Sequence, residues 1–293
     1  MRPGRAEDLA PLMELWREEV RAGRQDIVPD ESRMRRMLSR FDWEARSRMV
    51  EDGGRLAGAV LLMSRPSPEG VIANMYVAGA PEVSADLARW GVRLSRAAGA
   101  AVTQTFLARG QGEGLREAGM IVVRPWWRMD RSLAGDLPTP NAVAGYDLVD
   151  ATGAPEHSWA DLFNRTFADH WRFAPRVEEE VVDGKPPELC LMAVTSAGRS
   201  PVAITFGDVE RYPDDPRPQP VGVISSVGTL PEHRRRGLAT WLVAEVMRRL
   251  RRAGARHASL YVDGMNPMRA YDMYRRLGFE VTFEAEVWEA SSR

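Results

Sequence analysis

Cysteine is nearly absent from this chain of 293 residues, whose one thiol belongs to Cys190. A single cysteine excludes an intramolecular disulfide, so nothing in the sequence points to an oxidising compartment. Long apolar runs are missing too. No window approaches the roughly 18 uninterrupted apolar residues of a membrane span, and acidic residues stand where a signal peptide has its apolar core. We therefore expect a cytoplasmic protein without a membrane partner.

An excess of charge of either sign is also missing, because the formal net charge is −1. General affinity for nucleic acid or for an anionic membrane needs a basic excess, so neither partner is expected. Four histidines and one cysteine show no metal-ligand spacing, and we predict no metal site. A composition of 44% hydrophobic and 28% charged residues indicates a packed core.

What the chain does contain is an internal repeat. Leu87–Ala108 resembles Leu242–Asp263, since each is an amphipathic helix that ends in Ala-Gly-Ala and runs into a β-rich segment. Leu115–Met129 resembles Tyr274–Trp288, since each is a helix end, a glycine and a strand. On the repeat alone, chance similarity of such common pieces stays open as the alternative.

The two halves also match upstream of these segments. Ala6–Val20 and Pro155–Phe167 both read as helices, and hairpin signals follow around Gly53-Gly54 and around Gly198. Gly99 and Gly254 stand where a helix C-cap needs a residue that tolerates positive φ.

A segment rich in proline and small residues separates the halves, which is the composition of a linker. We predict one α/β domain over residues 1–133, the linker over 134–145, and a second domain over 146–293.

A strand, a basic turn and a helix follow one another after residue 220. Val221–Val227 is β-branched and apolar, Pro231 ends the ladder, and an amphipathic helix begins at Leu238. Between them lies Arg234–Ala239. Helix-start N–H groups lack internal partners, Gly237 lets a ligand approach the backbone, and arginines supply forked donors, so this turn suits a diphosphate.

These residues resemble the acyl-CoA-binding motif of the GNAT superfamily of N-acetyltransferases, Arg/Gln-x-x-Gly-x-Gly/Ala. Asn266–Glu280 resembles the later GNAT motif, in the order and spacing that the superfamily has. The matching positions are Arg234, Gly237, Ala239, Asn266, Ala270, Tyr274, Gly278 and Phe279. The tandem layout, with Phe167–Trp171, is similar to the two-domain, mycothiol synthase-like proteins.

The resemblance implies an α/β (α+β) fold of two tandem GNAT domains, each a mixed, mostly antiparallel twisted sheet flanked by helices. It also implies direct transfer of an acetyl or other acyl group from acetyl-CoA to the primary amine of a small molecule. Two alternatives stay open: a non-catalytic acyl-CoA-binding sensor or interaction protein, and a protein N-acetyltransferase. The preference for a small acceptor rests on analogy, since an extra domain roofs a cleft.

Site residues follow from the same resemblance. Tyr274 is the expected general acid, against the alternative that it packs in the core. An N–H near Val227–Thr229 is expected to polarise the thioester carbonyl, and Asn266 to hydrogen-bond the pantetheine arm or a strand carbonyl. The expected cofactor-binding residues are Val227, Thr229, Arg234, Arg235, Arg236, Gly237, Leu238, Ala239, Thr240, Asn266 and Tyr271.

The general base is left open, because the central strand offers only Ser225 and Ser226 where many relatives have a carboxylate. The remaining candidates are Asp208, Glu210, Asp169 and His170. Cys190 lies in an apolar run and is expected to be inert core rather than a nucleophile.

The first half is expected not to catalyse. Alignment of the halves sets Glu82 against Gly237 and Leu115 against Tyr274, so a carboxylate replaces the phosphate cradle and the candidate acid is missing. We expect this half to act as a built-in partner, making the chain a monomer that behaves as a pseudo-dimer; the alternative that it binds CoA in a non-standard way stays open. Trp126 and Trp127 either line the acceptor cleft or pack in the core.

The run Met247–Arg252 invites a nucleic-acid reading. At helical spacing its arginines cluster on one side of the helix, and a solvated face is the preferred interpretation.

Overall fold

Strands and helices alternate along the whole chain in the computed structural model, which describes residues 1–153, 158–212 and 214–291. The strands are β1 (Arg2–Pro3), β2 (Ser47–Asp52), β3 (Arg55–Arg65), β4 (Ile72–Gly79), β5 (Val102–Ala108), β6 (Ile121–Ser132), β7 (Tyr146–Asp150), β8 (Cys190–Thr195), β9 (Pro201–Glu210), β10 (Val221–Thr229), β11 (His257–Asp263) and β12 (Glu280–Ser291). The α-helices are α1 (Leu9–Arg21), α2 (Glu31–Met37), α3 (Trp43–Arg46), α4 (Pro81–Ala97), α5 (Glu113–Glu117), α6 (Trp159–Phe167), α7 (Glu178–Val182), α8 (Leu238–Arg252) and α9 (Ala270–Arg276). The 3-10 turns are η1 (Ala6–Asp8), η2 (Pro187–Leu189) and η3 (Pro231–His233).

The described strands form one sheet in the order β1-β2-β3-β4-β5-β12-β6-β11-β10-β9-β8-β7. Neighbours run antiparallel except at two places, β4 beside β5 and β10 beside β11. A strand, a crossover helix and a parallel strand therefore occur once in each half, with α4 and α8 as the crossovers. The expected class, a mixed and mostly antiparallel sheet flanked by helices, is confirmed.

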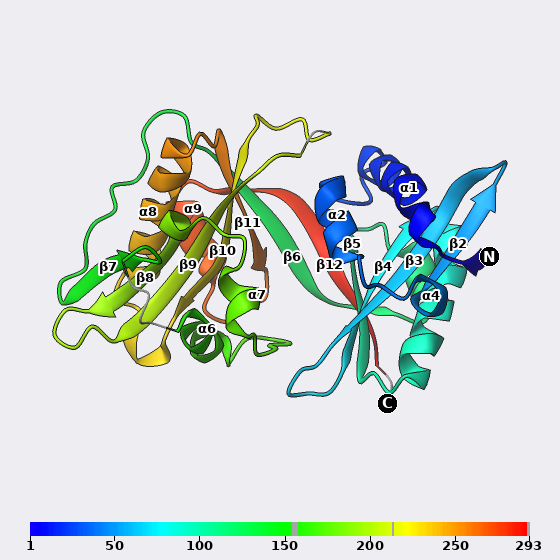
Figure 1. The fold of residues 1–293 in the computed structure, drawn as a ribbon, viewed down its shortest axis with the longest axis horizontal. Coiled ribbons are helices and arrows are strands. Elements are labelled where there is room, and N and C mark those ends of the chain that lie inside the picture. The colour runs from blue at the N-terminus through cyan, green and yellow to red at the C-terminus, as the bar shows by residue number, and fades with distance from the viewer. Residues whose placement is uncertain (154–157, 213, 292–293) are drawn as a thin grey trace.

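The two halves exchange their last strands. β6 closes the first repeat in sequence yet pairs with β11, and β12 closes the second repeat yet pairs with β5. The registers correspond, since Ser132 lies opposite His257 in one pair and Ser291 opposite Val102 in the other. β6 and β12 also pair with each other at the centre of the sheet (Figure 1). The division of the sequence at residues 134–145 does not predict this exchange, because it assigns β6 to the first domain and β12 to the second.

Helices cover both faces of the sheet, and successive strand residues point to opposite layers. In β3, Ala59 and Leu61 pack with α1, whereas Val60 and Leu62 pack in the cluster that contains residues of α4. Figure 1 shows α1 and α2 beside the N-terminal half and α6 and α7 over β9 and β10. The sheet is therefore the middle of three layers in each half.

Local turn chemistry agrees with the sequence. Gly99 and Gly254 follow α4 and α8 with φ of 77° and 92°, as C-caps require. Both expected hairpins, β2–β3 and β8–β9, are present. The helix expected over Pro155–Phe167 is observed from Trp159, and its predicted start at residues 154–157 lies outside the described residues. Cys190 is buried, and desolvation raises the pKa of its thiol to about 11, as inert core requires.

The arginine-rich end of α8 corrects one interpretation. Arg251 and Arg252 are exposed, but Arg248 and Arg249 are half-buried. Arg249 forms an ion pair with Asp150 at 2.6 Å, and Arg248 and Arg251 donate to carbonyls of residues 138 and 135 at 3.4 and 2.9 Å. This helix face therefore holds the connecting segment and β7 rather than being simply solvated.

Candidate active site

The centre of the C-terminal half opens because two parallel strands diverge. β10 and β11 pair only between Val221–Val223 and His257–Ser259. Further along, a bulge between Ser225 and Gly228 shifts the register of β10 against β9, and Ser226 takes a φ of 54°. Ser226 and Val227 have no partner on β9 at the bulge, and β10 has no partner on β11 beyond Val223, so backbone groups there lie outside both ladders.

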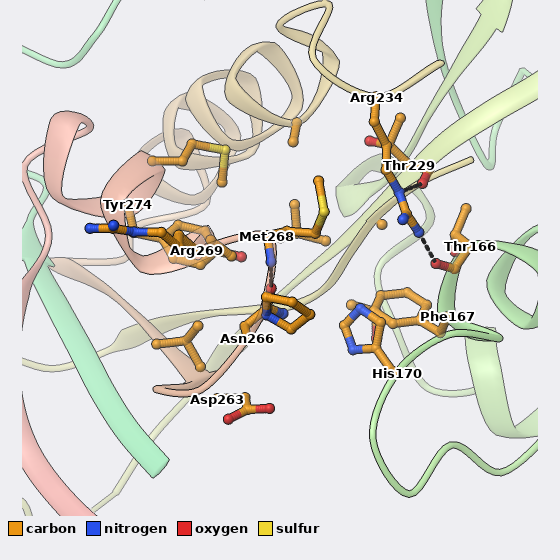
Figure 2. Close-up of a pocket in the computed structure, with 18 of the residues that line it drawn as sticks. Thr166, Phe167, His170, Thr229, Arg234, Asp263, Asn266, Met268, Arg269 and Tyr274 are labelled. Atoms are coloured by element: carbon orange, nitrogen blue, oxygen red, sulfur yellow. Dashed lines mark hydrogen bonds between the residues drawn. The ribbon is translucent and has the colours of Figure 1, made fainter. Parts of the chain in front are cut away.

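A cavity of about 1090 Å³ fills this divergence and is large enough for a sizeable ligand. It extends from the first turn of α8 to α9 and to the segment after α6 (Figure 2). The predicted site residues that line it are Val227, Thr229, Arg234, Arg235, Gly237, Leu238, Ala239, Thr240, Asn266 and Tyr274. Arg236 and Tyr271 do not line it.

The turn before α8 has the backbone of an anion cradle. Gly237 has a φ of 89° and Arg235 a φ of 63°, so successive N–H groups converge instead of alternating. No side chain caps the N-terminus of α8, which leaves the first N–H groups of Leu238 and Ala239 without a capping partner. A Cβ at Gly237 would meet only a side-chain carbon of Val143, at 3.8 Å. The positive φ, rather than crowding by protein, is what favours glycine here.

The three arginines of the turn do different things. Arg234 turns away from the helix start: its Nε donates to the Thr229 carbonyl at 3.0 Å (Figure 2). Its guanidinium also pairs with Asp169 at 2.7 Å. Arg236 donates to a backbone carbonyl of η3. Among the described residues, Arg235 has neither a hydrogen bond nor an ion pair to its side chain, which leaves it available for an anion.

Arg276 is a further unpaired cation that the sequence reasoning missed. It lies on α9, two residues after Tyr274, lines the cavity, and forms no ion pair among the described residues. The signal was present, because the second GNAT-like motif contains Arg275-Arg276. Sequence alone did not tell which of the two faces the cavity.

Tyr274 combines burial with an open hydroxyl. Its side chain is only 6% exposed and its ring packs edge-on against Phe279. No described residue hydrogen-bonds its hydroxyl, although the residue lines the cavity. Desolvation raises the pKa of Tyr274 above its ordinary value, which keeps the phenol protonated. The Tyr274 ring therefore packs in the core while the residue also lines the cavity.

Asn266 lines the cavity as expected of a site residue, whereas Tyr271 lies outside it. The Asn266 side-chain oxygen accepts from the Met268 N–H at 2.8 Å and so caps its own turn, while its side-chain N–H₂ donates to no strand carbonyl among the described residues. Tyr271 packs edge-on against Trp127, with ring centres 5.3 Å apart. Trp127 thus belongs to the core, whereas Trp126 lines the cavity.

The candidates for a general base differ in whether they line the cavity and in whether another residue already pairs with them. Glu210 forms an ion pair with Arg33, and neither it nor Asp208 lines the cavity. Asp169 is occupied by Arg234. His170 lines the cavity, stacks edge-on against Phe167, and has no hydrogen-bond partner on its ring among the described residues (Figure 2).

The wall opposite the basic turn carries paired charges and indole rings. Arg124 forms an ion pair with Asp263, and its guanidinium lies 4.2 Å from the ring centre of Trp171. Glu69 reaches the same wall from the N-terminal half and pairs with Arg172. Sequence reasoning offered Trp126 as one residue of this wall but missed its charged groups, because these come from both halves.

Known structures share this architecture. A GCN5-related N-acetyltransferase from Sphaerobacter thermophilus superposes with a TM-score of 0.80 at 21% identity, covering 100% of this chain and 95% of that one. A tandem GNAT protein from the clavulanic acid biosynthesis pathway gives 0.70 at 18% identity, covering 100% and 98%.

The chain has a tandem GNAT fold. A family model described as FR47-like protein matches residues 214–289 of the C-terminal GNAT domain. Proteins named mycothiol acetyltransferase from Kytococcus sedentarius and Thermobispora bispora are each 30% identical, over 174 and 164 residues. The matched part is 55% of this chain and 55% of each relative, so the chain spans about half the length of the curated relatives it matches.

The equivalent divergence in the N-terminal GNAT domain is filled by protein. β4 and β5 also pair over only three residues each, but the space beyond them is about 10 Å³. Glu19 and Arg24 form an ion pair there at 2.6 Å, and a Cβ on Gly114 of α5 would lie 2.4 Å from the Pro81 carbonyl at the start of α4. The start of α4, the counterpart of the start of α8, is thus covered by protein.

In the described part of this tandem GNAT fold, no helix combines the length and apolar character of a membrane span. The same residues hold no group of three or more side chains arranged to bind a metal ion.

Proposed function

We propose that this protein is an acyl-CoA-dependent N-acetyltransferase that acts on the primary amine of a small molecule through its C-terminal domain. One observation carries the proposal: a single cavity joins an uncapped helix start, a bulged central strand and a buried, protonated tyrosine. Those are the parts that acyl transfer from a CoA thioester needs, namely a phosphate cradle, a free N–H and a proton donor.

The residues present fit acetyl-CoA as co-substrate. The αL turn at Arg235 and Gly237 aims N–H groups outward, and the unpaired guanidinium groups of Arg235 and Arg276 supply charge for phosphate oxygens. Arg234 holds the turn against the end of β10 through Thr229 and takes a positioning role rather than a direct one. Bound there, acetyl-CoA supplies the activated acyl group.

The backbone and Tyr274 divide the remaining work. The N–H of Val227, freed at the bulge, polarises the acyl carbonyl as an oxyanion-hole donor does. The hydroxyl of Tyr274 gives its proton to the leaving thiolate of CoA. Its raised pKa keeps the hydroxyl protonated until negative charge develops on that sulfur. Asn266 offers its side-chain N–H₂ to the cavity while its oxygen caps the turn.

His170 is the general base in this proposal. Desolvation lowers the pKa of its imidazole, opposed by Asp169 and Asp263 and supported by Arg234, so the ring is neutral at pH 7. A neutral ring without a protein partner can accept the proton of an amine that enters from the wall of Arg124 and Asp263.

The two-domain layout belongs to the same proposal. Residues 1–133 form a degenerate domain that shapes the acceptor wall, residues 134–145 connect, and residues 146–293 bind acyl-CoA, with the last strands exchanged. We propose a monomer that behaves as a pseudo-dimer, working in the cytoplasm without nucleic-acid or membrane partners.

Calorimetry and turnover test the proposal together. Acetyl-CoA titrated into the wild type is expected to fill one site per chain, because the N-terminal space is filled by Glu19 and Arg24. With a panel of primary amines, Tyr274→Phe is expected to lower the rate of CoA release about 100-fold or more while acetyl-CoA affinity stays unchanged. Leu277→Met, a volume-conserving change on the same helix flank, is the control. Binding without CoA release from any amine would identify a sensor instead.

A further inference from the structure

Large aromatic side chains stay uncovered at the middle of the sheet. Tyr76 of β4, Phe106 of β5 and Tyr261 of β11 are 39%, 38% and 44% exposed, and Trp126 of β6 is partly exposed. We call these four side chains the aromatic floor. Figure 1 shows β6 and β12 crossing between the two groups of helices with no helix in front of them. Aromatic side chains left open on central strands mark a surface that binds something.

The four side chains share one face of the sheet. Trp126 lies opposite Asp263 and therefore on the side of Tyr261, whose hydroxyl reaches Asp26 in the segment after α1. Phe106 packs edge-on against Trp126 with ring centres 5.8 Å apart. The ring of Tyr76 lies beside that of Trp16 on α1, with ring centres 6.5 Å apart. The floor therefore faces the layer of α1 and α2.

This floor is continuous with the reaction cavity, because Trp126 and Tyr261 line that cavity. From β11 to β4 the sheet runs through β6, β12 and β5. Four strand spacings make the floor roughly 19 Å long. Small Ala285 of β12 lies opposite Trp126, which lets the Phe106 and Trp126 rings meet across that strand. Desolvation raises the pKa of Tyr76 and of Tyr261, as expected in a recess.

Charges along the floor are already matched within the protein. Arg124 pairs with Asp263 and Arg172 pairs with both Glu69 and Glu289. The Tyr76 hydroxyl, Arg124 Nε and Gln104 Oε1 have no partner among the described residues, so the floor offers ring faces for apolar contact and a few polar atoms that can orient a ligand.

We propose that the aromatic floor binds the flat, apolar body of the acceptor, an amine carried on an aromatic ring system, with the amine at the divergence of β10 and β11. This rests on the proposed N-acetyltransferase function and adds the class of acceptor. Recognition by ring faces gives an affinity that grows with the apolar area of the acceptor.

The test pairs turnover with direct binding. Ethanolamine, glucosamine, a peptide with a free N-terminus, phenethylamine, tryptamine and a naphthyl-methylamine are compared by CoA release. Each is also titrated by calorimetry into the full chain loaded with CoA. The variants are Phe106→Ala and the control Val122→Ala. Val122 is 43% exposed on β6, the strand that carries Trp126, but lies opposite Trp288, which packs against the other layer.

KM and Kd are expected to fall with ring area in the wild type, and Phe106→Ala is expected to raise both about tenfold for the ring-bearing amines only. Acetyl-CoA affinity stays unchanged in both variants. Turnover of ethanolamine, glucosamine or the peptide with no advantage for rings overturns the inference and leaves the proposed function intact. If amines bind according to ring area, lose that binding in Phe106→Ala and release no CoA, the aromatic floor is supported as a binding site and the proposed N-acetyltransferase activity is contradicted. Absence of amine binding overturns the inference.

Discussion

At the scale of single residues, the site depends on which polar side chains the protein leaves unpaired. Most charged groups near the cavity have partners, as Arg234 has Asp169 and Arg124 has Asp263. His170, Arg235 and Arg276 do not, among the described residues. Because an unpaired group beside a cavity is available to a ligand, we expect substitutions of these three residues to change binding or catalysis.

A pH profile tests His170. Its imidazole must be neutral to accept a proton, and desolvation lowers its pKa below the ordinary value, so kcat is expected to stay high down to below pH 6.5 and then fall. His170→Gln is expected to lower kcat about 100-fold and to abolish that acidic limb. The neighbouring groups Asp169, Asp263 and Arg234 all influence this titration, so the measurement compares full profiles of both proteins. An unchanged acidic limb in the variant would exclude His170 as the base.

The unpaired arginines are tested by affinity. Arg235→Gln and Arg276→Gln are each expected to weaken acetyl-CoA binding about fivefold to tenfold, since each removes a charge-assisted hydrogen bond to phosphate. Arg252→Gln, an exposed arginine at the far end of α8, is the control and should leave the Kd unchanged. Calorimetry at two salt concentrations measures the effect, which should shrink as salt rises.

At the scale of elements, the turn before α8 and the bulge in β10 make the site. Gly237 allows the αL turn, and the bulge between Ser225 and Gly228 leaves Ser226 and Val227 outside the ladder with β9. Both features were implicit in the sequence, the first as a basic glycine turn and the second only through the resemblance. Arg235 also has positive φ, which a glycine-based argument did not predict.

Substitutions at two glycines of similar backbone geometry distinguish an effect on acetyl-CoA binding from an effect on folding stability. Gly237 and Gly254 have φ of 89° and 92°, and no protein atom lies within 3.4 Å of a Cβ at either. Replacing either by alanine is expected to cost about 1–2 kcal/mol of stability through the positive φ. Only Gly237→Ala should weaken acetyl-CoA binding, by about tenfold, because only that turn faces the cavity. Equal binding by the two variants would contradict the assignment of the cradle.

At the scale of the whole molecule, the strand exchange makes the halves interdependent. Trp288 belongs to the second repeat, yet it is 1% exposed in the core cluster of the N-terminal half, with α4 and β3. β6 belongs to the first repeat and lies between β12 and β11. Each half therefore needs a strand from the other to complete its sheet, unlike two domains joined only by a linker.

Unfolding measurements test this dependence. The wild type is expected to unfold in one cooperative transition, and Trp288→Ala is expected to cost about 3–5 kcal/mol. The fluorescence of the whole chain and the loss of acetyl-CoA binding should follow the same denaturant curve. Val122→Ala, half-exposed on β6, should cost less than about 1 kcal/mol. Separate transitions for the N-terminal core and the acetyl-CoA site would contradict the expectation.

The sequence by itself determined what depends on local chemistry: the α8 helix and its cradle, the glycine C-caps, the hairpins, the inert Cys190 and the resemblance that implied a GNAT fold. These follow from periodicity, turn residues and motif spacing, which act over a few residues. Only the tertiary structure decided the strand exchange, the pairing of Arg234 with Asp169, the unpaired state of Arg276 and the aromatic floor. Each of these depends on which segments meet in the folded chain. The exchanged strands are more than a hundred residues apart and Arg234 is 65 residues from Asp169, so patterns over a few neighbouring residues do not determine these contacts.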